Sequence, residues 1–370
     1  MTQGSSGGLP LMRRLAIISA SAFATLFVAA LLALAWAGWI YAGAGPAGAK
    51  TSVVLRKGSS LPEIAAALER SGVVRSSSVF VLAAELTRAD RTLRAGEYEF
   101  PAHASMAAVL EKIRHGKVIR HAITLPEGIT SAEVARRLNA EPALVGVAPT
   151  PPEGAVLPET YDFERGEDRA AVLKRMMDAR DELLAQLWAK RQPGLPFQTP
   201  EEAVILASIV EKETGKPDER PRVAAVFINR LRKGMKLESD PTIIYGLTGG
   251  VPLGHGLRVS ELARPNPYST YQIFGLPPGP IANPGREALA AVLNPAQTAD
   301  LFFVADGTGG HAFAATLEEH NRNVEAWRGV EAGRKGPVAA TPLDVPKPAP
   351  VKLPPTEPAL KPPVKPGAKR

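Results

Sequence analysis

The sequence contains no cysteine, which excludes disulfides, thiolate nucleophiles and cysteine-ligated zinc sites. Its six histidines show no metal-ligand spacing, and there is no HExxH motif. A G-x-S-x-G elbow is also missing, and GTGG at 307–310 lacks the Lys-Ser/Thr of a phosphate-binding loop. We therefore expect no metal and no cofactor, and we expect GTGG to form a hairpin turn.

A basic face that could bind nucleic acid is not expected either, although the chain has a net charge of +7. From Arg334 to the C-terminus eight basic residues stand against two acidic ones, and Arg13 and Arg14 add two positive charges. The remaining sequence is nearly neutral, which argues against nucleic acid as a partner.

One long hydrophobic run is present. Residues 15–41 form 27 consecutive uncharged residues, more than the roughly 20 that span a bilayer. Aromatic residues typical of a membrane interface lie near its far end: Trp36, Trp39 and Tyr41. The basic pair before the run predicts a single-pass anchor, with residues 1–14 in the cytoplasm and the rest outside. The alternative is a cleaved signal peptide, since AGAGPAGA follows, but signal h-regions usually have about 7–15 residues.

Residues 52–145 repeat a pattern of strand, turn and amphipathic helix. It is clear in SVVLRKGSSLPEIAAALERSG and HAITLPEGITSAEVARRLNAE, and looser in GEYEFPAHASMAAVLEKIRHG. Ser60 with Glu63, and Thr130 with Glu133, have the spacing of capping boxes. Such modules suit a LysM-like glycan-binding region. The alternative is a scaffold that spaces the next domain from the membrane.

The composition divides the rest of the chain. GVAPTPPEGAVLPETYDF at 146–163 is rich in Pro and Gly and predicts a hinge, and a helix is expected over about 168–190. We place a mixed α+β domain at 146–333. Residues 334–370 combine recurring prolines with lysines, which is typical of a disordered tail. Such a tail either has no specific function or attracts anionic wall polymer or lipid weakly.

ILASIVEKETGK, at 205–216, is the stretch with candidate chemistry. In a helix over 202–214, one apolar stripe consists of Leu206, Ile209 and Val210. Glu213 continues this stripe. A carboxyl at the end of an apolar stripe is partly desolvated, which raises its pKa as a general acid near neutral pH requires.

The two glutamates of this stretch cannot share a helix face, because two residues correspond to about 200° of rotation. We expect Glu211 on the smaller, more polar side, exposed and ionised. The alternative for Glu213 is a structural role, paired with a nearby base such as Arg220 or Arg230.

Further segments frame this helix. A second helical stripe precedes a stop at Gly234, and its members are Val223, Val226, Phe227 and Leu231. SDPT at 239–242 predicts a turn, and the Pro-, Gly- and Tyr-rich loop at 266–285 is of a kind that lines clefts. Residues 301–321 predict a strand, a glycine turn, a second strand and a helix start. His311 and His320 are expected to be structural or surface residues rather than ligands.

Three long motifs resemble one known family. LASIVEKETGKPDERPRVAAVFINRLRKGMKLESDPTIIYG, YSTYQIFGLPPGPIANPG and FVADGTGGHAFAATLEEHN are similar, in this order, to the MltG (YceG-like) endolytic murein transglycosylases. VLPETYDF also looks like the segment that precedes the family's catalytic part. The resemblance runs from the membrane anchor to about Val330 and excludes the tail. It implies an α+β fold with an N-terminal transmembrane helix, a LysM-like region, a catalytic domain and a disordered Pro-rich tail.

The resemblance also implies a reaction. Such an enzyme sits in the inner membrane with a periplasmic catalytic domain and cleaves MurNAc-β-1,4-GlcNAc bonds inside nascent peptidoglycan strands. Cleavage leaves 1,6-anhydro-MurNAc ends, and the family's catalytic glutamate matches Glu213. The resemblance and the chemistry together also suggest other cleft groups: Asn229, Asp240, Tyr245, Tyr268, Tyr271 and His320. The implied partners are glycan strands, the membrane and peptidoglycan synthases.

Three other functions stay open at this point. A hydrolase would capture the same oxocarbenium-like centre with water, and Asp240 and Glu211 are the only nearby candidates for its second carboxylate. A catalytically silent wall-binding or division scaffold would not depend on Glu213. A soluble metabolic lyase is disfavoured by the anchor and by the lack of a cofactor motif.

Overall fold

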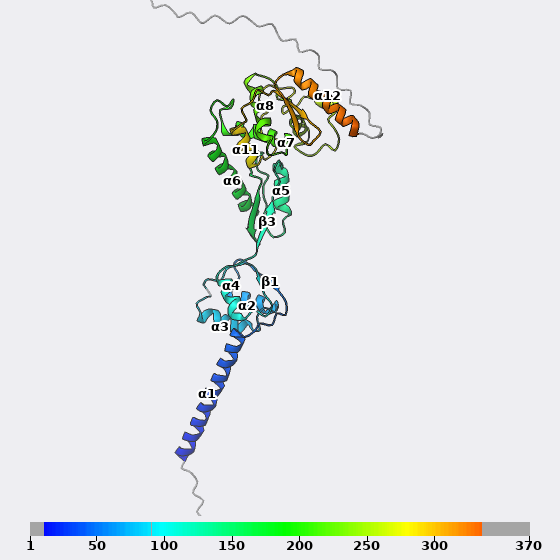
Figure 1. Cartoon of the computed structure of the whole chain (residues 1–370). Coiled ribbons are helices and arrows are strands. Elements are labelled where there is room, and N and C mark those ends of the chain that lie inside the picture. The colour runs from blue at the N-terminus through cyan, green and yellow to red at the C-terminus, as the bar shows by residue number, and fades with distance from the viewer. Residues whose placement is uncertain (1–10, 90, 335–370) are drawn as a thin grey trace, which may run out of the picture.

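The computed structural model describes residues 11–89 and 91–334 of the chain. A long helix, a small unit, a narrow neck and a larger unit follow one another (Figure 1). α1 (Leu11–Ala42) contains one stretch, Ser19–Ala42, that is long and apolar enough to cross a membrane. Most of the large apolar side chains of Ser19–Ala42 are exposed, which is compatible with a membrane anchor and with a signal sequence. The expected cytoplasmic residues 1–10 and the tail from residue 335 lie outside the described residues.

The small unit follows α1 and forms around one antiparallel strand pair. Its elements are β1 (Thr51–Leu55), α2 (Leu61–Arg70), α3 (Ser77–Leu86), β2 (Gly96–Phe100) and α4 (Met106–Arg114). Thr51 pairs with Phe100, and alternate residues of β2 point into a core that contains Tyr98 and Phe80. The capping box predicted at Ser60 is confirmed and begins α2.

The neck contains the module that begins with HAITL. Its elements are β3 (Arg120–Thr124), α5 (Ser131–Ala140), β4 (Thr160–Glu164) and α6 (Arg169–Ala189). β3 pairs with β4 instead of joining the first two modules, and α5 and α6 flank this ribbon (Figure 1). Thr130 caps α5, but the side chain of Glu133 binds two arginines instead of closing a capping box.

The segment at 146–163 is not a hinge. Val156 and Leu157 within it are buried, and its last residues form β4. Its prolines and glycines suggested a linker, but its few apolar residues fill the space between the neck and the C-terminal unit. The predicted helix that follows is confirmed as α6.

The larger unit packs α7, α8 and α11 around one core. Its elements are α7 (Pro200–Glu213), α8 (Arg220–Arg232), α9 (Asp240–Thr248), α10 (Val259–Ala263), α11 (Arg286–Leu293), β5 (Phe302–Ala305), β6 (His311–Ala314) and α12 (Leu317–Arg334). The predicted hairpin at GTGG is confirmed, since Asp306 N–H donates to Gly310 C=O. SDPT is not an isolated turn: Asp240 begins α9 and Ser239 is its N-cap residue. Pro241, the second residue of α9, favours a helix start.

The described chain is therefore a mixed α+β structure. Its strands form three separate two-stranded antiparallel sheets within the described residues. No extended sheet organises the larger unit, so its helices and the loop at 266–285 position the site.

Candidate active site

Glu213 lies at the C-terminal end of α7, as the apolar stripe predicted. Leu206, Ile209 and Val210 of this stripe are fully buried. The helix ends directly after Glu213, where Thr214 is extended and its N–H donates to Val210 C=O. The Glu213 carboxyl therefore lies at the edge of the core and is only partly exposed.

Burial raises the pKa of Glu213 to about 7. A hydrogen bond from Ser239 Oγ to Glu213 Oε1, at 2.5 Å, opposes this shift, and the negative charge of Asp240 adds to it. Among the described residues Glu213 forms no ion pair, because Arg220 pairs with Glu127 and Glu211 instead. The pairing of Glu213 with Arg220 or Arg230 is thus not found among the described residues, and the raised pKa allows the carboxyl to hold a proton near neutral pH.

Ser239, which donates to the Glu213 carboxyl, is itself held by two hydrogen bonds of its backbone. Its N–H donates to Thr270 Oγ1 at 2.9 Å, and its C=O accepts from Thr242 Oγ1 at 2.6 Å. The two threonine hydroxyls are 3.0 Å apart, and all three side chains are buried. The start of α9 and the loop at 266–285 are thereby joined under Glu213.

Asp240 and Tyr271 lie beside this group. Tyr271 Oη donates to Asp240 Oδ1 at 2.9 Å. Burial and the nearby carboxylates raise the pKa of Tyr271, so its phenol keeps its proton at neutral pH. Asp240 is exposed and Tyr271 is 38% exposed, so both can contact a ligand that reaches Glu213.

Tyr245 and Tyr268 form a second group. Their ring centroids are 4.9 Å apart, and Tyr245 Oη donates to Glu153 Oε2 at 3.2 Å. Burial raises the pKa of Glu153, whose other oxygen accepts from Ser131 N–H and from Asn283. These tyrosines tie the larger unit to the neck.

Asn229 and His320 are not joined to Glu213 by any hydrogen bond within the described chain. Asn229 donates to the carbonyls of Thr298 and Asp300, and so fastens the segment before β5 to α8. The ring of His320 stacks on Phe302 with centroids 5.1 Å apart, and burial lowers its pKa.

Glu211 is buried, not exposed as the sequence suggested. Its side chain is 4% exposed, Oε1 accepts from Arg220 at 3.3 Å, and Oε2 accepts from Gly285 N–H at 2.8 Å. The helix face was predicted correctly, but the end of the 266–285 loop covers it. Burial raises the pKa of Glu211. Glu127, in the turn after β3, completes the cluster through Arg220 at 2.9 Å.

The contacts of Ser239 and Glu127 were not predicted from the sequence, and Arg220, considered there as a partner of Glu213, pairs with Glu211 and Glu127 instead. The proline after Asp240 is a helix-start signal that would have indicated Ser239 as a cap. No local pattern indicates the contacts of Glu127 with α8, because they join distant parts of the chain. No three His, Asp or Glu side chains of residues 11–89 and 91–334 gather in a way that could hold a metal ion.

A model of a known protein family matches most of this chain. The model of the YceG-like family matches residues 53–326, which include every element from β1 to most of α12. The chain belongs to the YceG-like family. The match covers the Glu213, Ser239 and Tyr271 cluster and leaves out α1 and the tail.

Several relatives of this YceG-like chain are similar to it at 27% identity. Endolytic murein transglycosylases of Streptococcus pneumoniae, from strains D39 and R6, match over 323 residues, 74% of this chain and 57% of theirs. The chain thus spans little more than half the length of these relatives. The endolytic murein transglycosylase of Bacillus subtilis matches over 314 residues, 75% of this chain and 85% of its own. A crystal structure of a putative yceG-like protein from Listeria monocytogenes is 28% identical, with a TM-score of 0.47, and covers 74% of this chain and 98% of its own.

The ion cluster beside the site in this YceG-like chain leads to a stability prediction. Arg220→Met leaves the buried carboxyl of Glu211 without its cation, and we expect it to lower the free energy of unfolding by about 3 kcal/mol. Denaturant unfolding measures this change. Arg232→Met is the control, because Arg232 is exposed and its side chain only donates to Gly194 C=O. Equal stability of the two variants would show that the cluster does not hold the site together.

Proposed function

We propose that this chain is a peptidoglycan lytic endotransglycosylase, a carbon–oxygen lyase that cleaves MurNAc-β-1,4-GlcNAc bonds within nascent glycan strands. The observation that carries the proposal is Glu213, a carboxyl with a pKa of about 7 at the edge of the core, without an ion-pair partner among the described residues. Membership of the YceG-like family and the activity named for its relatives support it.

In the proposed reaction Glu213 acts first as acid and then as base. Its proton goes to the glycosidic oxygen as the bond from C1 to that oxygen breaks, and positive charge develops at C1. The 6-hydroxyl of the same sugar then attacks C1, and its proton returns to Glu213. One C–O bond forms for the one that breaks, no water is consumed, and the carboxyl regains its starting state.

The hydrogen bond from Ser239 suits this double role. It occupies Oε1, so Oε2 is the oxygen that can carry the transferred proton, and it fixes the orientation of the carboxyl. Asp240 is exposed and already accepts a hydrogen bond from Tyr271, so we assign these two to substrate contact rather than to a second catalytic carboxylate.

The other parts of the chain receive corresponding roles in this proposal. α1 anchors the protein in the inner membrane, with residues 1–14 in the cytoplasm and the part after α1 in the periplasm, where peptidoglycan synthases would be neighbours. The small unit is the LysM-like, glycan-binding part, and the catalytic part begins near β3, because β3 pairs with β4.

Product analysis tests the proposal. Purified sacculi are digested with the wild-type chain and, in parallel, with Glu213→Gln, and the released fragments are analysed by mass spectrometry. We expect 1,6-anhydro-MurNAc ends from the wild type only. Reducing MurNAc ends without anhydro ends would indicate a hydrolase. Unchanged glycan length in cells that carry Glu213→Gln would indicate a scaffold.

A further inference from the structure

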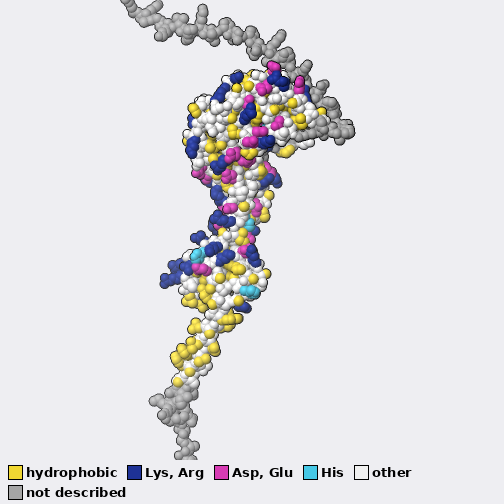
Figure 2. All heavy atoms as spheres, in the orientation of Figure 1, with side chains coloured by type: hydrophobic (Ala, Val, Ile, Leu, Met, Phe, Trp, Pro, Cys, Tyr) yellow, Lys and Arg dark blue, Asp and Glu magenta, His cyan; other side chains and the backbone are white. Residues whose placement is uncertain are grey.

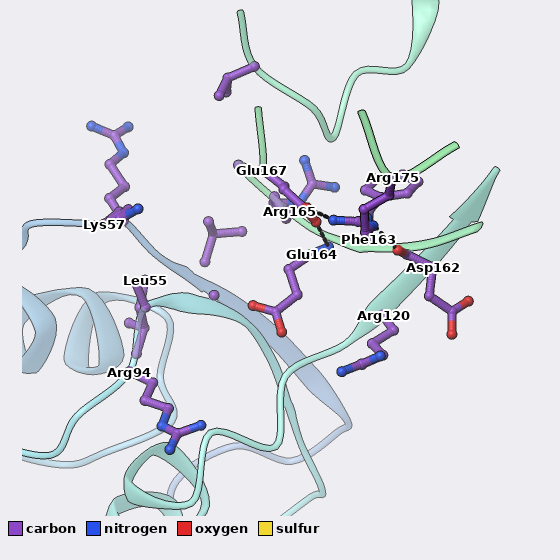
Figure 3. Close-up of a pocket in the computed structure, with 16 residues that line it drawn as sticks. Leu55, Lys57, Arg94, Arg120, Asp162, Phe163, Glu164, Arg165, Glu167 and Arg175 are labelled. Carbon is purple, nitrogen blue, oxygen red and sulfur yellow. Dashed lines mark hydrogen bonds and ion pairs between the residues drawn. The ribbon is translucent and has the colours of Figure 1, made fainter. Parts of the chain in front are cut away.

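A cleft of about 980 Å³ lies where the small unit meets the neck (Figure 3). One wall is formed by the end of β1 and the residues before β2, and the other by the start of β3 and the end of β4. It is separate from the Glu213 cluster, with which it shares no residue. Figure 2 shows basic side chains gathered at this level of the molecule.

The cleft carries an excess of positive charge. Six basic side chains line it, against three acidic ones. Two of the six are neutralised, since Arg165 pairs with Glu97 at 2.7 Å and Arg175 pairs with Glu167. The other four have no hydrogen bond or ion pair from their side chains within the described chain: Arg56, Lys57, Arg94 and Arg120.

Two of these free cations face one space. Arg94 and Arg120 come from opposite walls and lie on either side of the region that the Glu164 carboxylate enters (Figure 3). Arg120 is directly opposite Glu164 in the β3–β4 register, yet the two form no ion pair. The aliphatic stem of Arg94 lies against Gly116, where a larger residue would meet it. Free guanidinium groups bind carboxylates and phosphates well.

The two walls are joined by a polar clamp. Glu97 of β2 accepts from Arg165 and from His121, both at 2.7 Å, and its C=O accepts from Ile119 N–H. The Glu97 side chain is only 14% exposed, and Arg165 lowers its pKa. The clamp joins the two walls without using the free cations of the cleft.

We propose that this cleft binds the carboxylate-bearing peptide stems of peptidoglycan, while the sugar backbone is cut at Glu213. The inference rests on the proposed function. A short peptide with several free carboxylates fits a cleft that combines four free cations with exposed apolar side chains on both walls, Val54 and Val145. In stem-bearing strands the lactyl carboxyl of MurNAc is bound in the amide to the stem, so the free carboxylates lie on the peptides.

Binding measurements test this proposal separately from catalysis. The full chain in detergent, carrying Glu213→Gln so that strands stay intact, is titrated with glycan strands that bear peptide stems and with the same strands after amidase removal of the stems. When Arg94→Gln and Arg120→Gln are both introduced into this parent chain, we expect binding of stem-bearing strands to weaken about tenfold, because two exposed charged contacts are lost. Arg70→Gln/Arg328→Gln removes the same charge outside the cleft and is expected to bind as the parent does.

Glu164→Gln provides a test with the opposite sign. It removes a negative charge from the cleft and is expected to tighten binding of stem-bearing strands more than binding of stripped strands, which keep only the lactyl carboxylates of MurNAc. Equal affinity of all variants for stem-bearing strands, or equal losses on both kinds of strand, would overturn the proposal. Binding of the same variants to vesicles that contain anionic phospholipid is measured in parallel. A loss of binding that is confined to these vesicles would also overturn the proposal, and would identify a lipid headgroup as the ligand. Failure of the anhydro-product test would leave these binding results intact, so the two proposals can fail separately.

Discussion

Glu213→Gln is expected to lower the rate of glycan cleavage by about 10²–10⁴-fold, the usual contribution of a general acid–base group. The amide has the shape of the carboxyl and can still accept the hydrogen bond from Ser239, so the geometry of the site is kept. What is lost is the proton that must reach the glycosidic oxygen. Initial rates on purified strands, measured at neutral pH, give the ratio.

The matched control is Glu201→Gln, an exposed glutamate in the first turn of the same helix. It is expected to cleave as the wild type does. Glu213→Gln should also unfold at no lower denaturant concentration than the wild type, because a neutral amide replaces a carboxyl that burial already disfavours in its ionised form. Retention of more than a tenth of the wild-type rate by a folded Glu213→Gln chain would remove this residue from the role of acid.

The sequence predicted the position of Glu213 because that position depends on one helix alone. Helical periodicity places it after Leu206, Ile209 and Val210, and these residues are buried as expected. The same periodicity placed Glu211 on the correct face and still misjudged its environment. A helical wheel shows which way a side chain points, but not that a loop 74 residues further along the chain covers it.

The same limit explains the errors in the fold. Strand–helix modules are local and were recognised in β1–α2 and β3–α5, whereas strand partners are not local. β3 pairs with a strand hidden in a proline-rich segment, and this pairing moves the module from the small unit to the neck. Ser239 was missed as a site residue for a similar reason, because its contact with Glu213 joins residues 26 positions apart.

The activity is expected to depend on pH in a way that reports the groups around Glu213. Because the acid must hold a proton, the pH profile of kcat/KM should have an alkaline limb that begins near pH 7, the pKa of Glu213. Along this limb kcat/KM should fall about tenfold per pH unit. Loss of a proton from a group with an ordinary pKa would place this limb near 4.5 instead. A rate that is constant from pH 6 to 9 would contradict protonated Glu213 as the acid.

Ser239 and Asp240 should move this limb in opposite directions. The Ser239 hydroxyl donates to the carboxyl and so favours its ionised form, and Ser239→Ala is expected to raise the limb by about one pH unit, given that such bonds contribute roughly 1.5–3 kcal/mol. The negative charge of Asp240 favours the protonated form, so Asp240→Asn should lower the limb. Ser239→Thr, which keeps a hydroxyl, should restore the wild-type position. If Ser239 contributed only packing, Ser239→Ala would lower the rate without moving the limb. Shifts of the same sign in Ser239→Ala and Asp240→Asn would contradict an electrostatic origin of the raised pKa of Glu213.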